Sequence, residues 1–146
     1  MIAIASDHAA ASLRTVVRNY LKENDIPFMD MGTDEAPSDY PVMAMAVCAA
    51  IEDGTADMGV LLCGTGIGMS MTANKCKGIR AAVCTETYSA KYTRLHNDAN
   101  VLCMGARVVG EGLAVEILKT FLETGFEGGR HQRRIDMMMS LEHTDD

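Results

Sequence analysis

A short glycine-rich loop that begins with a cysteine is the segment best suited to chemistry. It follows the apolar run 58–62 directly and consists of Cys63, Gly64, Thr65, Gly66, Ile67 and Gly68. Closely spaced glycines let a backbone turn tightly and point successive N–H groups at an anion. The positive end of a following helix stabilises a thiolate, so Cys63 could act as a nucleophile or a general base. Thr65 is near enough in sequence to pass a proton or to bond an oxyanion held by the same amides.

Other glycine-loop sites fit this segment less well. A dinucleotide site needs GxGxxG after the first strand and an acidic residue about 20 positions later, and a Walker loop needs GK[ST]. A cysteine-phosphatase loop would close on an arginine, whereas Met69 follows Gly68 here. A tight strand-to-helix turn with an inert cysteine remains open. The other four cysteines, Cys48, Cys76, Cys84 and Cys103, lie in or beside apolar segments and are interpreted as packing residues.

Two pairs of polar residues could complete a site around Cys63. Asp7 and His8 follow the apolar run 2–6, so they should project from the same edge of a sheet as Cys63. Arg130 and Arg134 are four positions apart and share one face of a helix, an arrangement that can grip a phosphate. A solvated basic helix is the plainer interpretation of the arginines, and the role of His131 stays undecided.

His96 and Asn97 precede the last predicted strand, which places them at the opposite, amino end of the sheet. If His96 is catalytic, it must therefore serve the site of a neighbouring subunit, and the protein must be at least a dimer. Arg107 follows the last strand and could serve either pocket. The four histidines, at positions 8, 96, 131 and 143, have no HxH or HxxxH spacing, so we expect neither a metal nor another cofactor.

The bulk composition narrows the class of protein. The 146 residues carry a net charge of −7, which disfavours nucleic acid and anionic membranes as partners. Five scattered cysteines favour a reducing compartment over a disulfide framework, and no targeting leader is recognised, so we expect a cytoplasmic protein. No linker or repeat divides the chain, and residues 1–146 are predicted to form a single domain.

The polar residues need elements that position them, and the hydrophobic pattern supplies alternating strands and helices. Strands are expected over residues 2–6, 28–31, 58–62, 79–84 and 101–104. Helices are expected around residues 13–22, 41–51, 68–73, 86–95, 113–122 and 130–141. This alternation predicts an α/β, doubly wound, five-stranded parallel sheet with helices on both faces and strand order 2-1-3-4-5. Ligands bind such sheets at the carboxyl edge where the strand order reverses, here between the first and third strands.

The pattern also makes predictions for two surface segments. Arg14, Arg18 and Lys22 are expected on the wet side of the first helix. The acidic tail 142–146 is expected to be disordered.

Eight motifs in order give the chain a specific resemblance. They are SDH at 6–8, DYP at 39–41, CGTGIG at 63–68, ANK at 73–75, GIRAAVC from 78, HNDANVL from 96, GARVVG from 105 and GGRHQRR from 128. In nearly its whole length the chain resembles the type B ribose-5-phosphate isomerase family, which includes the galactose-6-phosphate isomerase subunits. The resemblance implies a Rossmann-like homodimer that could pair into a tetramer, with no metal or nucleotide. The C-terminal helical tail is expected to reach the dimer partner.

The same resemblance implies a role for each motif residue. Cys63 would move the proton between C2 and C1 with help from Thr65, His96 would open the furanose ring, and the amides of residues 64–68 would stabilise the enediolate. Asp7 would handle the sugar hydroxyls or ring oxygen, and Tyr40 would line the pocket. The phosphate would be bound by His8, Arg107, Arg130 and Arg134, with Asn97 contributing across the dimer.

Two departures from the family pattern stand out. Ala9 or Ala10 occupies a position after SDH where members commonly carry glycine. Met69 and Ser70 lie where another branch has a glutamate base, so Cys63 has no carboxylate rival. The main hypothesis is interconversion of ribose 5-phosphate and ribulose 5-phosphate through a cis-enediolate, in the pentose phosphate pathway. The alternatives are a hexose-6-phosphate isomerase, acting on allose or galactose 6-phosphate, and a non-catalytic phosphosugar-binding domain.

Overall fold

The computed structural model describes residues 1–32 and 39–143 of the chain. Its strands are β1 (Ile2–Ser6), β2 (Phe28–Asp30), β3 (Met58–Cys63), β4 (Ala81–Val83) and β5 (Val101–Gly105). Its α-helices are α1 (Ala11–Glu23), α2 (Tyr40–Glu52), α3 (Ile67–Ala73), α4 (Thr87–Asn97), α5 (Glu111–Glu123) and α6 (Arg130–Ser140). Short 3₁₀ turns cover His8–Ala10 and Leu141–His143. The α/β class and the alternation expected from the sequence are confirmed.

The five strands form one parallel sheet in the order β2-β1-β3-β5-β4. The predicted order 2-1-3-4-5 is therefore wrong at its last two positions. All five residues of β5 are buried, whereas the three residues of β4 are only half-buried. A short strand with small side chains suits the edge of a sheet, and a fully apolar one suits its centre. The reversal between β1 and β3 is unaffected by this exchange.

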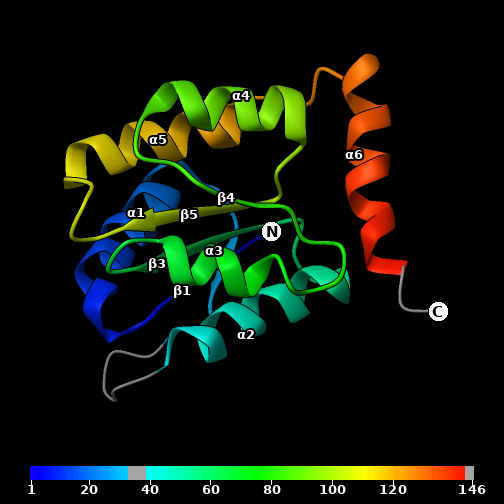
Figure 1. The fold of residues 1–146 in the computed structure, drawn as a ribbon. Helices are drawn as coiled ribbons and strands as arrows, with labels where there is room; N and C mark the ends of the chain where they lie inside the picture. The colour runs from blue at the N-terminus through cyan, green and yellow to red at the C-terminus, as the bar shows by residue number, and fades with distance from the viewer. Residues whose placement is uncertain (33–38, 144–146) are drawn as a thin grey trace.

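Helices cover both faces of the sheet (Figure 1). One apolar core joins the sheet to α1, α4 and α5 and includes Val17, Ala90 and Phe121. A second core, with α2 and α3 on the opposite face, includes Val47 and Met69. Helix α2 is apolar nearly all round because it packs on both β1 and α3, although Val42 and Met45 remain exposed on its outer side.

Arg14 corrects the prediction of a wet basic face on α1. Its side chain is only 2% exposed, and its guanidinium donates to Ser6 Oγ at 3.0 Å. Its Nε lies 3.4 Å from Asp30 Oδ2, which Arg18 Nε approaches at the same distance. A buried arginine is stable only when its charge and donors are paired. The arginine thus ties α1 to the carboxyl ends of β1 and β2.

Helix α6 stands beside the sheet rather than on it (Figure 1). Two successive glycines with positive φ, Gly128 (75°) and Gly129 (59°), redirect the chain after α5 so that α6 can begin at Arg130. Contrary to the expectation of a disordered tail, Leu141–His143 form a turn and Glu142 Oε1 accepts the Gly78 N–H at 2.9 Å. Residues 144–146, the rest of that predicted tail, lie outside the described residues. Among the described residues, no helix has the length and apolar character needed to cross a membrane.

Candidate active site

The carboxyl ends of β1 and β3 lie side by side and bring two predicted motifs together. Ser6 is aligned with Leu62 in the parallel register, and the Asp7 N–H donates to Leu62 O at 3.1 Å. The SDH segment therefore continues directly beside Cys63. This is the topological switch point at which ligands bind in open α/β sheets.

Cys63 lies beneath its own glycine loop. The side chain is 5% exposed, and Sγ accepts a hydrogen bond from the Gly66 N–H at 3.1 Å. Gly66 can turn this amide towards the sulfur because its φ is +81°, and an added Cβ would lie 2.9 Å from the Met104 carbonyl carbon. The Ile67 N–H donates to Thr65 Oγ1 at 3.2 Å. A hydrogen bond from a backbone amide stabilises the charged form of a sulfur, so the loop suits a thiolate.

Tyr40 and Arg107 flank this loop. An added Cβ on Gly68 would lie 2.5 Å from Tyr40 Cε1, so the ring leans directly on the first turn of α3. The Arg107 N–H donates to Gly64 O at 3.0 Å, and an added Cβ on Gly64 would lie 3.6 Å from the Arg107 guanidinium. From the sequence, Arg107 could serve the pocket of its own chain or that of a partner. In the structure, Arg107 lies beside the Cys63 loop.

The side chain of Asp7 is hydrogen-bonded to the backbone, whereas that of His8 is exposed. Asp7 Oδ1 accepts the Ala9 N–H at 3.0 Å and so caps the 3₁₀ turn that precedes α1. His8 is exposed within that turn. One carboxylate oxygen of Asp7 is therefore fixed by the backbone of the turn.

Three of the remaining cysteines are held in the thiol form by burial. Burial, with a smaller effect from neighbouring Cys76, raises the pKa of Cys48 to about 12. Burial and the Glu86 charge raise the pKa of Cys84 to about 11, and burial raises the pKa of Cys103 well above its ordinary value. These thiols are unsuited to act as bases near neutral pH, in line with the packing role predicted for them.

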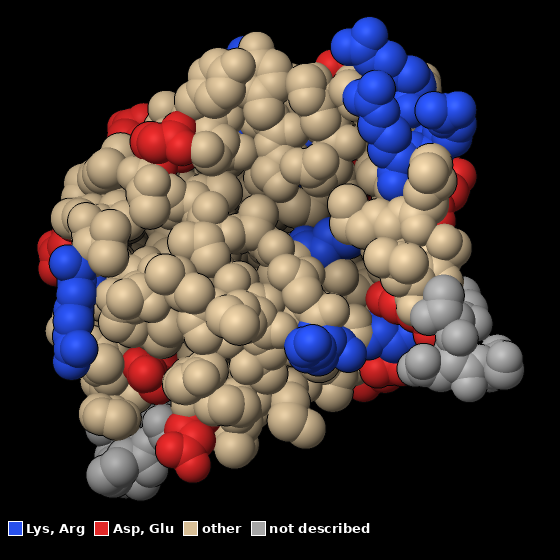
Figure 2. Space-filling view, in the orientation of Figure 1, with Lys and Arg blue, Asp and Glu red and all other residues tan. Residues whose placement is uncertain are grey.

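The other predicted site residues lie at the opposite end of the sheet. His96 and Asn97 end α4 just before β5 begins, and Arg130 and Arg134 are exposed on α6. Figure 2 shows a cluster of basic side chains over the N-terminal part of α6. Within one chain the structure thus separates these four residues from the Cys63 loop.

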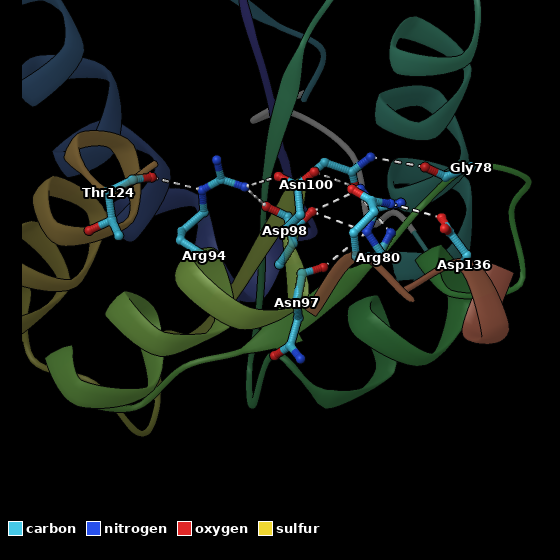
Figure 3. Close-up of polar contacts among 10 residues, drawn as sticks. Gly78, Arg80, Arg94, Asn97, Asp98, Asn100, Thr124 and Asp136 are labelled. Atoms are coloured by element: carbon cyan, nitrogen blue, oxygen red, sulfur yellow. Dashed lines mark hydrogen bonds and ion pairs between the residues drawn. The ribbon is translucent and has the colours of Figure 1, made fainter. Parts of the chain in front are cut away.

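Contacts from two arginines, the buried Arg94 and the partly buried Arg80, fix the turn that follows Asn97 (Figure 3). Asp98 adopts a left-handed conformation with φ 46°, and its carboxylate accepts from Arg94 at 2.9 Å and approaches Arg80 at 3.5 Å. Arg80 also donates to the carbonyl oxygens of Asn97 and Asp98 at 3.1 and 2.9 Å. These contacts fix the backbone at the end of α4, from which the side chains of His96 and Asn97 project.

His96 has two partners that the sequence did not assign. Its ring stacks on that of His131 with centroids 4.0 Å apart, and its Nε2 lies 3.6 Å from Glu127 Oε2. Burial, then the neighbouring His96, lowers the pKa of His131. Glu127 and His131 lie on either side of the glycine pair 128–129. In the sequence, this pair is the one feature that indicates a sharp turn of the chain, which could bring both residues back onto α4.

Two hollows adjoin Asn97. One of about 340 Å³ is lined by His96, Asn97, Tyr88, Tyr92 and part of β4. A larger groove of about 900 Å³ runs between α6 and the amino edge of the sheet and is lined by Asn97, Arg80 and Met138, among others. Both hollows therefore lie on the side of the molecule that carries Asn97.

Comparisons with known proteins agree over the whole length of the chain. The model of the Ribose/Galactose Isomerase family matches residues 2–138. A Bacillus subtilis protein described only as a candidate sugar phosphate isomerase is 50% identical over 97% of this chain and 96% of its own length. Ribose-5-phosphate isomerase B of Escherichia coli is 44% identical over 97% of this chain and 95% of its own length. The crystal structure of ribose-5-phosphate isomerase B from Mycoplasma genitalium with bound ribulose-5-phosphate has a TM-score of 0.93 and 40% identity, and the match covers 98% and 96% of the two chains.

Proposed function

Because this chain belongs to the ribose/galactose isomerase family, we propose that it interconverts ribose 5-phosphate and ribulose 5-phosphate with Cys63 as the base. The observation that carries the proposal is the Gly66 N–H hydrogen bond to Cys63 Sγ, 3.1 Å long, at the switch point of the sheet. The substrate follows from similarity to ribose-5-phosphate isomerases, one of which binds ribulose-5-phosphate.

The proposed reaction is a proton transfer between adjacent carbons. The Cys63 thiolate removes the C2 proton of the open-chain aldose, which leaves a cis-enediolate, and returns the proton to C1 to give the ketose. Thr65 moves the accompanying proton between O1 and O2, while the amides of residues 64–68 stabilise the developing negative charge. Asp7 binds the sugar hydroxyls or ring oxygen, and Tyr40 lines the pocket. Hydrogen moves only within the substrate, so the step needs no external oxidant and no redox cofactor.

The furanose must open before C2 becomes acidic, and we assign that step to His96 of a partner subunit. His96 and Cys63 lie at opposite ends of the sheet, so one chain cannot bring them together. A homodimer with two shared sites solves this, and a tetramer could form by further pairing. Exposed apolar side chains on α2 and α3, among them Val42, Met45 and Met71, offer a surface of the kind that partners bury.

Phosphate binding would draw on both groups of residues. His8 and Arg107 would contribute from the chain that carries Cys63, and Asn97, Arg130 and Arg134 from its partner. The two exposed arginines, one helical turn apart, present guanidinium groups suited to a bidentate grip on phosphate oxygens. A site assembled in this way would also use the α6 tail as the arm that reaches across.

A coupled assay of purified protein with ribose 5-phosphate, chelator present, tests the proposal. Allose 6-phosphate and galactose 6-phosphate serve as comparison substrates. Strong turnover of the pentose supports the assignment. Turnover of a hexose phosphate alone would retain the mechanism and replace the substrate, and binding of all three without turnover would favour a phosphosugar-binding domain.

A further inference from the structure

Three potential metal ligands converge at the amino end of the sheet, although they come from distant parts of the chain. They are His96 at the end of α4, Glu127 before the glycine pair and His131 in the first turn of α6. One donor atom from each can be chosen so that all lie within 4.8 Å of one another. The separation between His96 Nε2 and Glu127 Oε2 is 3.6 Å.

The backbone holds the three residues in place. The Glu127 N–H donates to Leu95 O at 3.1 Å, which fixes Glu127 against the last turn of α4. The His131 N–H donates to Gly128 O at 3.2 Å, and its ring lies nearly parallel to that of His96, at 12°. The cluster is therefore a product of the fold rather than a chance meeting of mobile side chains.

One nitrogen in the cluster lacks a partner. His131 is 5% exposed, and its Nε2 is a buried atom without a hydrogen-bond partner among the described residues. A buried polar atom left unpaired destabilises the fold, so such an atom calls for a ligand. This nitrogen belongs to the ring that stacks on His96. The side chains of His96 and Glu127 are open to solvent, with exposed fractions of 35% and 56%.

We propose that His96, Glu127 and His131 form an inhibitory site for a divalent transition-metal ion of the zinc type. Two imidazoles and a carboxylate suit zinc better than magnesium or calcium, which prefer oxygen ligands. Ligand bonds of about 2.1 Å place tetrahedral donors about 3.4 Å apart, close to the existing 3.6 Å pair. The His96 ring must turn relative to the buried His131 ring for both to aim at one ion, and its 35% exposure leaves room for that, while the exposed Glu127 carboxylate can follow. The fourth position stays open to water.

Occupancy would remove His96 from catalysis. A ring nitrogen bonded to a metal ion neither accepts nor donates a proton, so sugar-ring opening would stop. This inhibitory role rests on the function proposed above, whereas metal binding itself does not.

Titration of metal-free protein with Co²⁺ provides the direct test. Saturable visible absorption of the tetrahedral cobalt type, lost when Zn²⁺ is added, is the expected result. Glu127→Gln, at an exposed position, and His131→Asn should each weaken Co²⁺ binding at least about 10-fold, because each removes one of three ligands. His8→Asn removes an exposed histidine outside the cluster and should leave binding unchanged. No saturable spectrum, or equal binding by Glu127→Gln and wild type, would overturn the site.

Turnover distinguishes this proposal from the function on which part of it rests. Zn²⁺ should inhibit the wild-type enzyme reversibly, with recovery on addition of chelator, and should inhibit Glu127→Gln only at higher concentration. A cobalt spectrum without inhibition would overturn the inhibitory role and retain the site. Failure of the proposed function would appear instead as absence of turnover in metal-free protein, while the cobalt titration would still decide the site.

Discussion

Cys63 and His96 lie at opposite ends of the same parallel sheet. Cys63 is aligned with Gly105 at the carboxyl end of β5, whereas His96 lies five positions before Val101, the first residue of that strand. The whole length of β5 thus separates the proposed base from the proposed ring-opening residue. Both can act on one sugar only if they come from different subunits, and this geometry makes the assembly testable.

Subunit mixing tests the shared site. Cys63→Ala and His96→Asn homodimers should each have little activity on ribose 5-phosphate. A denatured and refolded equal mixture should regain about a quarter of wild-type activity, because half the dimers are mixed and each mixed dimer has one intact site. Each variant refolded alone is the control. An unchanged, inactive mixture would contradict a site shared between subunits.

The role of Cys63 can be separated from binding. Cys63→Ala should lower kcat by about 10²–10⁴-fold, the usual contribution of a general base, while calorimetry still detects sugar-phosphate binding. Cys76→Ala, at a half-buried position away from the loop, is the matched control and should retain activity. Near-normal turnover by Cys63→Ala would remove this residue as the base.

Gly66 should matter for both stability and turnover. Alanine at its φ of +81° costs about 1–2 kcal/mol in backbone strain, and its Cβ would also meet the Met104 backbone at 2.9 Å. We expect Gly66→Ala to lower both Tm and kcat, because the N–H that bonds Cys63 must move. Gly54→Ala, with φ +84° and nothing within 4 Å of the added Cβ, should lower Tm only. Equal effects of the two changes on kcat would contradict the role of the Gly66 amide.

Two arginines on α1 that share one carboxylate should differ in their contribution to stability. Arg14→Met leaves the buried Ser6 hydroxyl without its donor, and we expect a loss of about 2 kcal/mol in the free energy of unfolding. Arg18→Met removes a partly exposed ion pair and should cost less than about 1 kcal/mol. Urea unfolding of both variants measures the difference. Similar losses would mean that the burial of Arg14 contributes little.

The sequence predicted the helices and strands well, and it predicted which residues meet at the carboxyl ends of β1 and β3. Element type depends on local hydrophobic periodicity, and residues that directly follow parallel strands must share an edge, which brought Asp7 and Cys63 together in advance. The roles assigned to these residues remain predictions. Their grouping needed only the strand assignments and the reversal between the first and third strands.

Relationships between distant segments could not be predicted in this way. The order of β4 and β5 depends on which strand can be buried on both sides, and the partners of Arg14 depend on where β2 ends. His96 and His131 are 35 positions apart, a spacing with no local meaning, and only the turn at Gly128 and Gly129 brings them into contact. Neither pattern matching nor composition contains that information.

The exchanged strand order has a consequence for how the chain folds as it is synthesised. β1 lies between β2 and β3 and can pair with both as soon as these strands leave the ribosome. β4 emerges next but has no strand to pair with, because its one neighbour, β5, is made about twenty residues later. One edge of β3 therefore stays unpaired until β5 is made, and β5 then pairs with both β3 and β4. Closure of the fold is thus a late, long-range event, of the kind that slows folding.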